Sequence, residues 1–332
     1  MAAIIGRAPA VRMRLMRRRL LLAIAGFVLA LPRVTAEDAT IPPRHFTLAP
    51  AGEGVYAAIA KPGDKDAGGN AGFVVGTDSV LVVDTFESAA AAEELVFEIR
   101  KITPLPVRWV VNTHYHLDHV AGNGVFQKGG AVIVAHENVR PWLRTENLKW
   151  WKEISAEDRD KVEHLVLPDV VHKDGLGIWL GERQVQVLAR PGHTGGDSIV
   201  VVPSANVVFA GDLFWKNTVP NLIDATTDSW VNTLDGFIQV YGTATYVPGH
   251  GELGKALDVR YFRDYLAGLR MSVARGLSAG KSDADLTNDV LAQQKARYGT
   301  WGWFDGFARR NIELTEQEIK GTKKLPRPPD SK

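Results

Sequence analysis

Residues 113–119, Thr-His-Tyr-His-Leu-Asp-His, place four side chains that can bind metal within one short stretch. Histidine is scarce in the chain, with 9 in 332 residues. His114 and His116 are two positions apart, so they share one face of an extended segment but lie on different faces of a helix. Asp118 and His119 continue beyond them and can face a second point in space. The spacing therefore indicates two metal ions rather than one.

A strand is predicted immediately before this motif. Residues 107–111, Val-Arg-Trp-Val-Val, form a short apolar run typical of a buried strand, and residues 120–124 are typical of a loop or the start of a helix. The motif therefore follows the end of a strand, where α/β folds usually place their chemistry.

Further ligands are expected downstream, because a catalytic zinc ion usually takes three protein ligands and keeps one position open. His193, Asp212 and His250 each follow an apolar, strand-like run and lie in a glycine-rich turn, where glycine lets the backbone approach closely. The three turns are Pro-Gly-His-Thr-Gly-Gly-Asp (191–197), Phe-Ala-Gly-Asp-Leu-Phe (209–214) and Val-Pro-Gly-His-Gly (247–251). With the first motif they complete a set of candidate metal ligands.

These motifs, in this order, resemble those of the metallo-β-lactamase-fold hydrolase superfamily, and the resemblance covers roughly Phe46 to Lys255. It implies an α/β fold, specifically a four-layer αββα sandwich. It also implies two zinc ions with the following ligands: His114, His116 and His193 for the first ion, Asp118, His119 and His250 for the second, and Asp212 between the two.

The chain contains no Cys, whereas several β-lactamases of this superfamily use Cys at the position of Asp212. With Asp at this position, the chain more closely resembles the glyoxalase II-like thioesterases and the exported hydrolases linked to sulfur oxidation and quinoprotein systems. The resemblance implies that metal-bound hydroxide, oriented by Asp118 as a catalytic residue, attacks a thioester, ester or β-lactam carbonyl. Two alternatives stay open: an iron-dependent sulfur dioxygenase, since the same ligands suit iron, and a non-catalytic accessory protein of a periplasmic redox system.

Other polar residues have weaker patterns around them. Lys216 and Asn217 follow the Asp212 motif, so we expect them to meet an anionic group of the substrate, with turn capping by Asn217 as the alternative. Asp84 and Asp197 are either acceptors for ligand-histidine N–H groups or ordinary carboxylates at a strand end and a turn. The remaining histidines have no motif and are expected to be surface or satisfied polar residues, namely His45, His136, His164 and His172.

The N-terminal residues have the pattern of an export signal. Arg14 and residues 17–19, all Arg, precede an apolar run over residues 20–31 and the small residues Val34-Thr35-Ala36. The apolar run is short for a bilayer span, so a cleaved signal peptide over residues 1–36 is expected, with no stable membrane insertion afterwards. The arginines weakly resemble a twin-arginine signal, and the predicted location is the periplasm or the exterior.

The rest of the chain predicts a hydrolase domain over residues 47–255, a helical extension over 256–322 and a disordered tail over 323–332. Within the first, strands are expected over the ranges 47–60 and 70–85, a flexible loop over 61–69, and helices over 88–101 and 138–165. In the extension, five apolar residues recur at spacings of 3 and 4, as on one helical face: Val259, Phe262, Leu266, Leu269 and Val273.

An aromatic cluster lies near the C-terminal end of the predicted extension and consists of Tyr298, Trp301, Trp303, Phe304 and Phe307. We expect it to pack the extension on the sandwich, with a dimer contact as the alternative. Trp142, Trp150 and Trp151 are likewise expected to be packing residues rather than the mouth of a site. The net charge of +1 and the lack of a basic stripe argue against a nucleic-acid partner and leave a small-molecule substrate.

Overall fold

The computed structural model describes residues 42–150 and 153–327. The predicted signal peptide and residues 328–332 of the predicted tail lie outside the described residues, as does Trp151. Contacts within the chain separate Met1–Arg33 from Val34–Lys332, and the fold below is that of the second unit.

The larger of two β-sheets combines antiparallel and parallel pairing. Within the described residues it has seven strands in the order β1-β2-β3-β4-β5-β6-β7, antiparallel from β1 to β4 and parallel from β4 to β7. Their bounds are β1 (Phe46–Gly52), β2 (Val55–Ala60), β3 (Ala71–Val75), β4 (Val80–Val83), β5 (Val107–Val111), β6 (Val132–His136) and β7 (Val170–His172). The strands expected over 47–60 and 70–85 are each two strands, because tight turns such as the one at Gly54 (φ +64°) reverse the chain.

The smaller sheet carries the downstream motifs. In the described part of the chain it has five strands in the order β12-β11-β10-β9-β8, of which only β11 and β12 pair in parallel. Their bounds are β8 (Gly175–Leu180), β9 (Arg183–Ala189), β10 (Ser198–Val202), β11 (Val207–Trp215) and β12 (Thr245–His250). Asp212 lies within β11 and His250 ends β12, so these two neighbouring strands bring both residues to one place.

Helices surround the two sheets. Those before β7 are α1 (Ala89–Ile102), α2 (Leu117–Val120), α3 (Asn123–Lys128), α4 (Val139–Trp142), the 3-10 helix η2 (Asn147–Trp150) and α5 (Ala156–Glu163). Those after β10 are the 3-10 helix η3 (Pro203–Ala205), α6 (Thr227–Val240), α7 (Ala256–Ser278), α8 (Asp283–Tyr298) and α9 (Phe304–Ile319). Within the described residues, none of these helices combines the length and apolar character that crossing a membrane requires.

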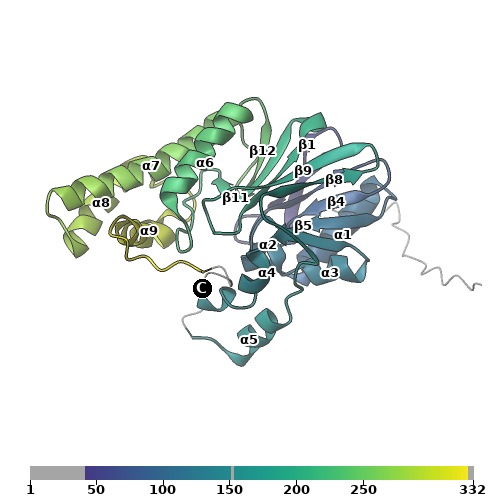
Figure 1. Ribbon diagram of the computed structural model, residues 1–332, viewed down its shortest axis with the longest axis horizontal. Helices are drawn as coiled ribbons and strands as arrows, with labels where there is room; N and C mark the ends of the chain where they lie inside the picture. Colours follow the sequence, from purple (N-terminus) through teal and green to yellow (C-terminus); the bar gives the residue numbers. More distant parts are fainter. Residues whose placement is uncertain (1–41, 151–152, 328–332) are drawn as a thin grey trace, which may run out of the picture. The chain divides into compact units, whose positions relative to one another are not determined.

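The layers follow from the alternation of side chains along the strands. In β4, Leu81 packs in a core shared by the two sheets, whereas Val80 and Val82 pack in a second core with α1 and α3. Ile199 of β10 packs with α6 and α7 in a third core on the outer face of the smaller sheet. Figure 1 shows these helix pairs on opposite sides of the strands. The predicted four-layer αββα sandwich is therefore confirmed.

The helix predicted over 88–101 is α1, and the Ser88 side chain accepts a hydrogen bond from the Ala91 backbone N–H at its start. The helical region predicted over 138–165 consists of three short helices, α4, η2 and α5. Ser155 begins the last of them by a reciprocal capping interaction with Asp158, which starts a new helix rather than continuing an old one.

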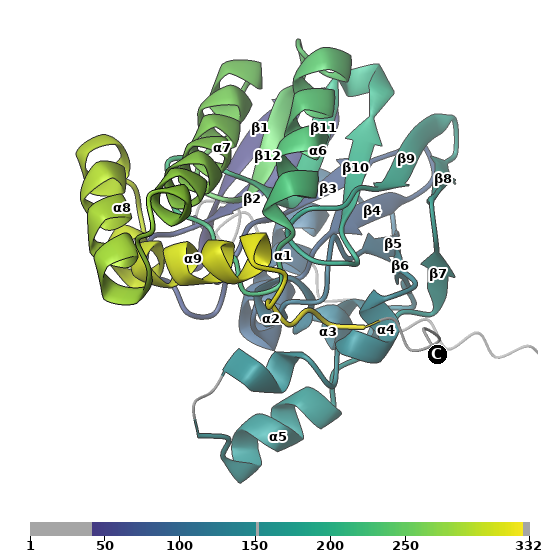
Figure 2. The same cartoon turned by 60° about the vertical axis from the view of Figure 1, so that its left-hand side comes forward.

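The helical extension consists of α7, α8 and α9, which lie beside one another (Figure 2). The predicted apolar face of α7 is buried at all five positions, namely Val259, Phe262, Leu266, Leu269 and Val273. Hydrogen bonds hold the chain after α9: the Lys323 ammonium donates to the carbonyls of Leu222 and Ala225, and the Trp142 indole N–H donates to the Arg327 carbonyl. Lys323 and Arg327 of the predicted disordered tail thus have specific partners, and buried Trp142 is a packing residue as expected.

Candidate metal centre

The first motif lies in the bend between β5 and α2. The strand ends at Val111, and His116 directly precedes α2 with extended backbone angles (φ −65°, ψ 148°). Asp118 and His119 are already part of α2. Asp118 and His119 belong to a different group of candidate ligands from His114 and His116, although the ring centroids of His114 and His119 lie only 4.4 Å apart.

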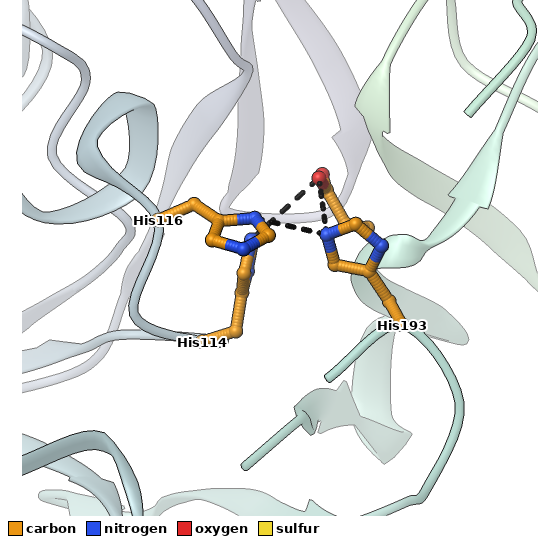
Figure 3. Close-up of side chains that lie close together, drawn as sticks. His114, His116 and His193 are labelled. Atoms are coloured by element: carbon orange, nitrogen blue, oxygen red, sulfur yellow. Dashed lines mark hydrogen bonds and ion pairs between the residues drawn. The ribbon is translucent and has the colours of Figure 1, made fainter. Parts of the chain in front are cut away.

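One group of candidate ligands contains three histidines and Asp212. Side-chain atoms of His114, His116, His193 and Asp212 lie within 4.8 Å of one another, and all four residues are buried. His193 Nε2 lies 3.0 Å from His116 Nδ1 and 3.2 Å from Asp212 Oδ2, while His114 Nε2 lies 3.6 Å from the same oxygen. Figure 3 shows the three imidazole rings converging from two separate segments of the chain. The structure thus brings together residues up to 98 positions apart in the printed numbering.

A second group lies on the other side of Asp212. It consists of Asp118, His119 and His250, whose side-chain atoms also lie within 4.8 Å of one another. Asp118 Oδ2 is 3.3 Å from Nε2 of each histidine. Asp212 Oδ1 is 3.2 Å from His119 Nε2 and 3.3 Å from His250 Nε2. The two oxygens of Asp212 therefore face two different groups of histidines.

The chemistry of these atoms fits a pair of metal ions. His114 Nε2, His119 Nε2 and Asp212 Oδ1 are buried and make no hydrogen bond. A buried polar atom without a partner is unfavourable by about 1–3 kcal/mol, so several at one place need an explanation. Imidazole nitrogens and carboxylate oxygens are zinc ligands, and they suit iron as well. Cations between the two groups would satisfy the atoms that the protein leaves without a hydrogen bond.

The pKa shifts at the site separate neutral from charged ligands. Burial lowers the pKa of His114 well below its ordinary value, so this imidazole is neutral. Burial opposes charge on Asp212, but the surrounding histidines, with His250 foremost, hold the pKa of its carboxyl well below its usual range. Burial also opposes charge on His250, yet Asp212 and Asp118 raise the pKa of its imidazole to about 9. Because a ligating imidazole must be neutral, metal binding is expected to release protons.

Two buried carboxylates orient the candidate ligands. Asp84 accepts hydrogen bonds from His119 Nδ1 (2.9 Å) and from the Thr113 backbone N–H (2.7 Å), in a left-handed backbone conformation (φ +58°). Asp224 lies 3.3 Å from His116 Nε2 and also pairs with the Lys149 ammonium. Such partners fix the orientation of a ligating imidazole. Asp224 was missed in the sequence because no local pattern surrounds it and its partner lies in a distant motif.

Asp197 and Asn217 are each held by hydrogen bonds, and their predicted roles at the site stay predictions. Asp197 accepts hydrogen bonds from the backbone N–H and hydroxyl of Thr194, within its own turn. Asn217 adopts a left-handed conformation (φ +53°), and its carbonyl accepts from the Gly302 N–H. The Lys216 ammonium donates to the Leu253 carbonyl (2.7 Å). The substrate contacts of Lys216 and Asn217 stay predictions, although both line a cavity beside the site.

The histidines without a motif lie outside the two groups. His136 Nδ1 accepts from a backbone N–H, His172 lies 3.2 Å from the Ser198 hydroxyl, and His164 is exposed directly after α5. His45 is buried and lies 3.1 Å from Asp64, whose carboxylate also accepts from two N–H groups of the 61–69 loop. These bonds hold a loop that the sequence predicts to be flexible.

Two adjoining cavities reach the candidate ligands. The inner cavity has a volume of about 250 Å³ and is lined by Glu87, His116, Leu117, Asp118, His193, Asp212, Trp215, Asn221, His250, Trp303 and Phe307. The outer cavity has a volume of about 990 Å³ and shares Glu87, Asp118, His250 and Trp303 with it. Burial, and after it the Asp118 carboxylate, raise the pKa of Glu87 to about 7. Sequence reasoning missed Glu87, which has no motif, and expected Trp303 and Phe307 to pack the extension on the sandwich or to make a dimer contact.

A family model described as the metallo-beta-lactamase superfamily matches residues 64–255. This chain belongs to that superfamily. The matched range contains every one of the seven candidate ligands and ends one residue before α7 begins.

Similar proteins of this superfamily differ in their named activities. The chain is 21% identical over 254 residues to the linear primary-alkylsulfatase of Pseudomonas sp., covering 64% of this chain and 48% of the relative. It is 26% identical to the metallo-beta-lactamase type 2 of Bacteroides fragilis (56% and 70% covered). It is 28% identical to the hydroxyacylglutathione hydrolase of Brucella anthropi (52% and 57% covered). The chain thus spans only about half the length of two of these three relatives.

Solved structures share the fold. The metallo-beta-lactamase from Pontibacter korlensis matches 67% of this chain and 99% of its own, with a TM-score of 0.56 and 22% identity. A double mutant of the sec-alkyl sulfatase PisA1 matches 83% of this chain and 50% of its own, with a TM-score of 0.66 and 14% identity. Residues 1–255 make up less than 83% of the chain, so the second likeness includes part of the helical extension.

Proposed function

We propose that this protein is a hydrolase whose active site holds two zinc ions between the seven clustered residues. The observation that carries the proposal is the position of Asp212. Its Oδ1 faces His119 and His250, and its Oδ2 faces His114 and His193, at 3.2–3.6 Å. A carboxylate shared in this way suits two ions a few ångströms apart, which is the spacing that two-metal hydrolysis uses.

Bound ions would lower the pKa of a water molecule and polarise the carbonyl oxygen of a substrate. Asp118 is the candidate for orienting that water, because its carboxylate lines the inner cavity beside His119 and His250. It accepts a hydrogen bond from the water and can take a proton at a carboxylate oxygen. Glu87 lines the same cavity, and a pKa of about 7 suits it to hold a proton near neutral pH.

The substrates we propose are thioesters, esters or β-lactam amides. In thioester hydrolysis the acyl carbon–sulfur bond breaks, the water oxygen bonds to the acyl carbon, and the departing sulfur receives a proton. The relatives named hydroxyacylglutathione hydrolase and metallo-beta-lactamase support this range. The residue between the two groups of candidate ligands is Asp212, and the chain contains no Cys that could take that place. Within the proposed range of substrates, this favours thioesters.

Metal analysis and turnover of the same preparation test the proposal. Purified protein should contain about two zinc ions per chain and hydrolyse a thioester or a chromogenic cephalosporin. Asp212→Asn should lower the metal content and reduce turnover by at least about 100-fold. Asp160→Asn is the matched control, because Asp160 is exposed on α5 and belongs to neither group. A protein that binds no metal, or an Asp212→Asn variant with full metal content and turnover, would overturn the proposal.

The candidate ligands suit both zinc and iron. The same preparation is therefore also tested for iron and for the activity of an iron-dependent sulfur dioxygenase. One iron per chain, with no hydrolysis but with oxygen uptake on addition of a persulfide, would replace the hydrolase proposal. Metal-containing protein with neither activity would favour the accessory-protein alternative.

We also propose that the protein is exported with cleavage of an N-terminal signal near Ala36. The support is the arginine-rich start, the apolar run over residues 20–31 and the small residues that follow. Cell fractionation and N-terminal sequencing of the full chain expressed in a bacterial host test this proposal. Protein that keeps its N-terminus and stays in the cytoplasm would contradict it.

A further inference from the structure

The helical extension contributes part of the wall of the inner cavity. Trp303 and Phe307, which lie beyond the range matched by the family model, line it together with Trp215 of β11. The Trp303 ring centroid lies 4.9 Å from that of His250, 5.3 Å from that of Trp215 and 5.7 Å from that of Phe307. Aromatic rings thus continue from a candidate metal ligand to the opening of the cavity.

Backbone hydrogen bonds hold Trp303 in this position. The preceding residue, Gly302, donates its N–H to the Asn217 carbonyl (2.9 Å) and accepts from the Val219 N–H (2.8 Å). Trp303 itself adopts a left-handed conformation (φ +59°) and is 48% exposed. A bulky residue in this conformation is an outlier that the surrounding structure must hold in place. The chain therefore holds a half-exposed tryptophan, in a strained conformation, beside His250 in the wall of the inner cavity.

The same loop is fixed from α9. The Asn311 side chain accepts from the Leu222 backbone N–H (3.2 Å) and donates to the Pro220 carbonyl (2.7 Å), and Asn311 is fully buried. Residues 217–222 follow β11, which carries Asp212. Hydrogen bonds therefore hold the extension to this loop, and the loop continues directly from the strand that carries Asp212, so the aromatic wall has a defined position beside the ligands.

The two cavities differ in chemistry. Among the described residues, no Lys or Arg lines the inner cavity. Beside the candidate ligands it is lined by four apolar side chains, Leu117, Trp215, Trp303 and Phe307, and by two polar ones, Glu87 and Asn221. Its volume of about 250 Å³ exceeds the roughly 150 Å³ of a cavity known to take one benzene ring. The outer cavity shares Glu87 and Asp118 with the inner one and adds charged side chains of both signs, namely Lys61, Asp64, Lys65, Lys216 and Glu252.

We infer that the extension selects substrates with a flat, apolar acyl group, such as an aromatic ring, and a polar leaving group. The ring occupies the inner cavity against Trp303 and Phe307, and the leaving group extends into the outer cavity. Offset or edge-to-face stacking on the indole stabilises such a ring beyond the area it buries. This inference rests on the proposed hydrolase function, because it assigns the two sides of the hydrolysed bond to the two cavities.

The test compares two thioesters that share one leaving thiol and differ in a benzoyl or an acetyl group. Metal-loaded full chain should prefer the benzoyl thioester in kcat/KM, and Trp303→Ala should lower the benzoyl-to-acetyl ratio about tenfold. Trp303→Phe keeps an aromatic ring and should retain most of the preference. Trp179→Ala is the matched control, because Trp179 is 60% exposed on β8 and lines neither cavity.

Calorimetric binding of a non-hydrolysable benzyl thioether to the same proteins separates this inference from the hydrolase proposal. Protein that hydrolyses neither the thioesters nor a chromogenic cephalosporin, but binds the thioether in a Trp303-dependent way, would contradict the hydrolase proposal and support the aromatic pocket. Protein that hydrolyses both thioesters, with a ratio that Trp303→Ala and Trp179→Ala leave equal, would overturn the pocket and leave the hydrolase. Metal content and circular dichroism show whether each variant is folded. If Trp303→Ala does not fold, the benzoyl-to-acetyl ratio of Trp303→Phe is compared with that of the unmodified chain instead.

Discussion

Gly249 offers a direct test of how closely Asp212 is held. It precedes His250 in β12, and a Cβ atom added there would lie 1.8 Å from Asp212 Oδ1. Contacts shorter than 3.0 Å are essentially never found for real Cβ atoms, so Gly249→Ala must push the carboxylate more than an ångström out of place. The added atom would also lie 2.8 Å from the Gly211 carbonyl carbon, where backbone has to move. The substitution therefore displaces Asp212, the residue whose carboxylate faces both groups of candidate ligands.

The expected size of the effect follows from this displacement. A misplacement of about 1 Å in an active site can reduce the rate about 100-fold, so kcat/KM should fall by at least that factor. Overpacking that shifts side chains and neighbouring backbone typically costs about 1–3 kcal/mol, so the loss of unfolding free energy should lie in this range. The assays are zinc per chain by elemental analysis, turnover of the best thioester or cephalosporin, and denaturant unfolding.

Gly236→Ala is the matched control for this substitution. Gly236 lies within α6, and a Cβ atom there would meet nothing within 4 Å. Alanine in a helix is more favourable than glycine by about 0.5–1 kcal/mol, so this variant should be slightly more stable, with unchanged metal content and turnover. A Gly249→Ala protein with two zinc ions and wild-type turnover would refute the conclusion that the position of Asp212 controls the site.

Three further predictions follow from individual contacts. Asp84→Asn removes the charged acceptor of the His119 ring, so zinc affinity should fall about 10–100-fold in a competition titration with a chelator, and an unchanged affinity would contradict the orienting role. His116→Ala should abolish turnover whereas His136→Ala, outside both groups, should leave it nearly unchanged; comparable losses in both would count against the ligand assignment. Burial, and then His136, lower the pKa of His172 to about 4 from an ordinary 6.5, so the folded state binds fewer protons than the unfolded state between these values. Metal-free protein should therefore lose stability as the pH falls from 6.5 to 4, and His172→Gln should lose less, as measured by thermal unfolding at both pH values.

The local part of the site follows from the sequence because it depends on spacing alone. His114, His116, Asp118 and His119 lie within one bend and one helical turn, so short-range geometry decides which of them can share a point in space. The same holds for the helical face of α7, where spacings of 3 and 4 identify the buried side. The helical region predicted over 138–165 consists of three short helices, and the last of them begins at the Ser155 cap.

The contacts between distant segments could not be derived from such patterns. Asp224 lies 108 positions from His116 and has no motif around it, yet it is buried against that ring. Which residue of a loop meets a given ligand depends on how two sheets pack, and packing is set by many side chains at once rather than by local preference.

What the sequence by itself determined is the set of candidate ligands, their order along the chain and the sandwich that the motifs imply. Only the tertiary structure decided that the two oxygens of Asp212 face different histidine groups, and that Trp303 stands over the site rather than merely packing the extension. The physical reason is that ligand type and strand alternation are properties of a few neighbouring residues. The direction of a buried carboxylate, and the return of a C-terminal helix to a loop more than 80 positions earlier, depend on burial and hydrogen bonds between elements, such as those of Asn311 with Pro220 and Leu222.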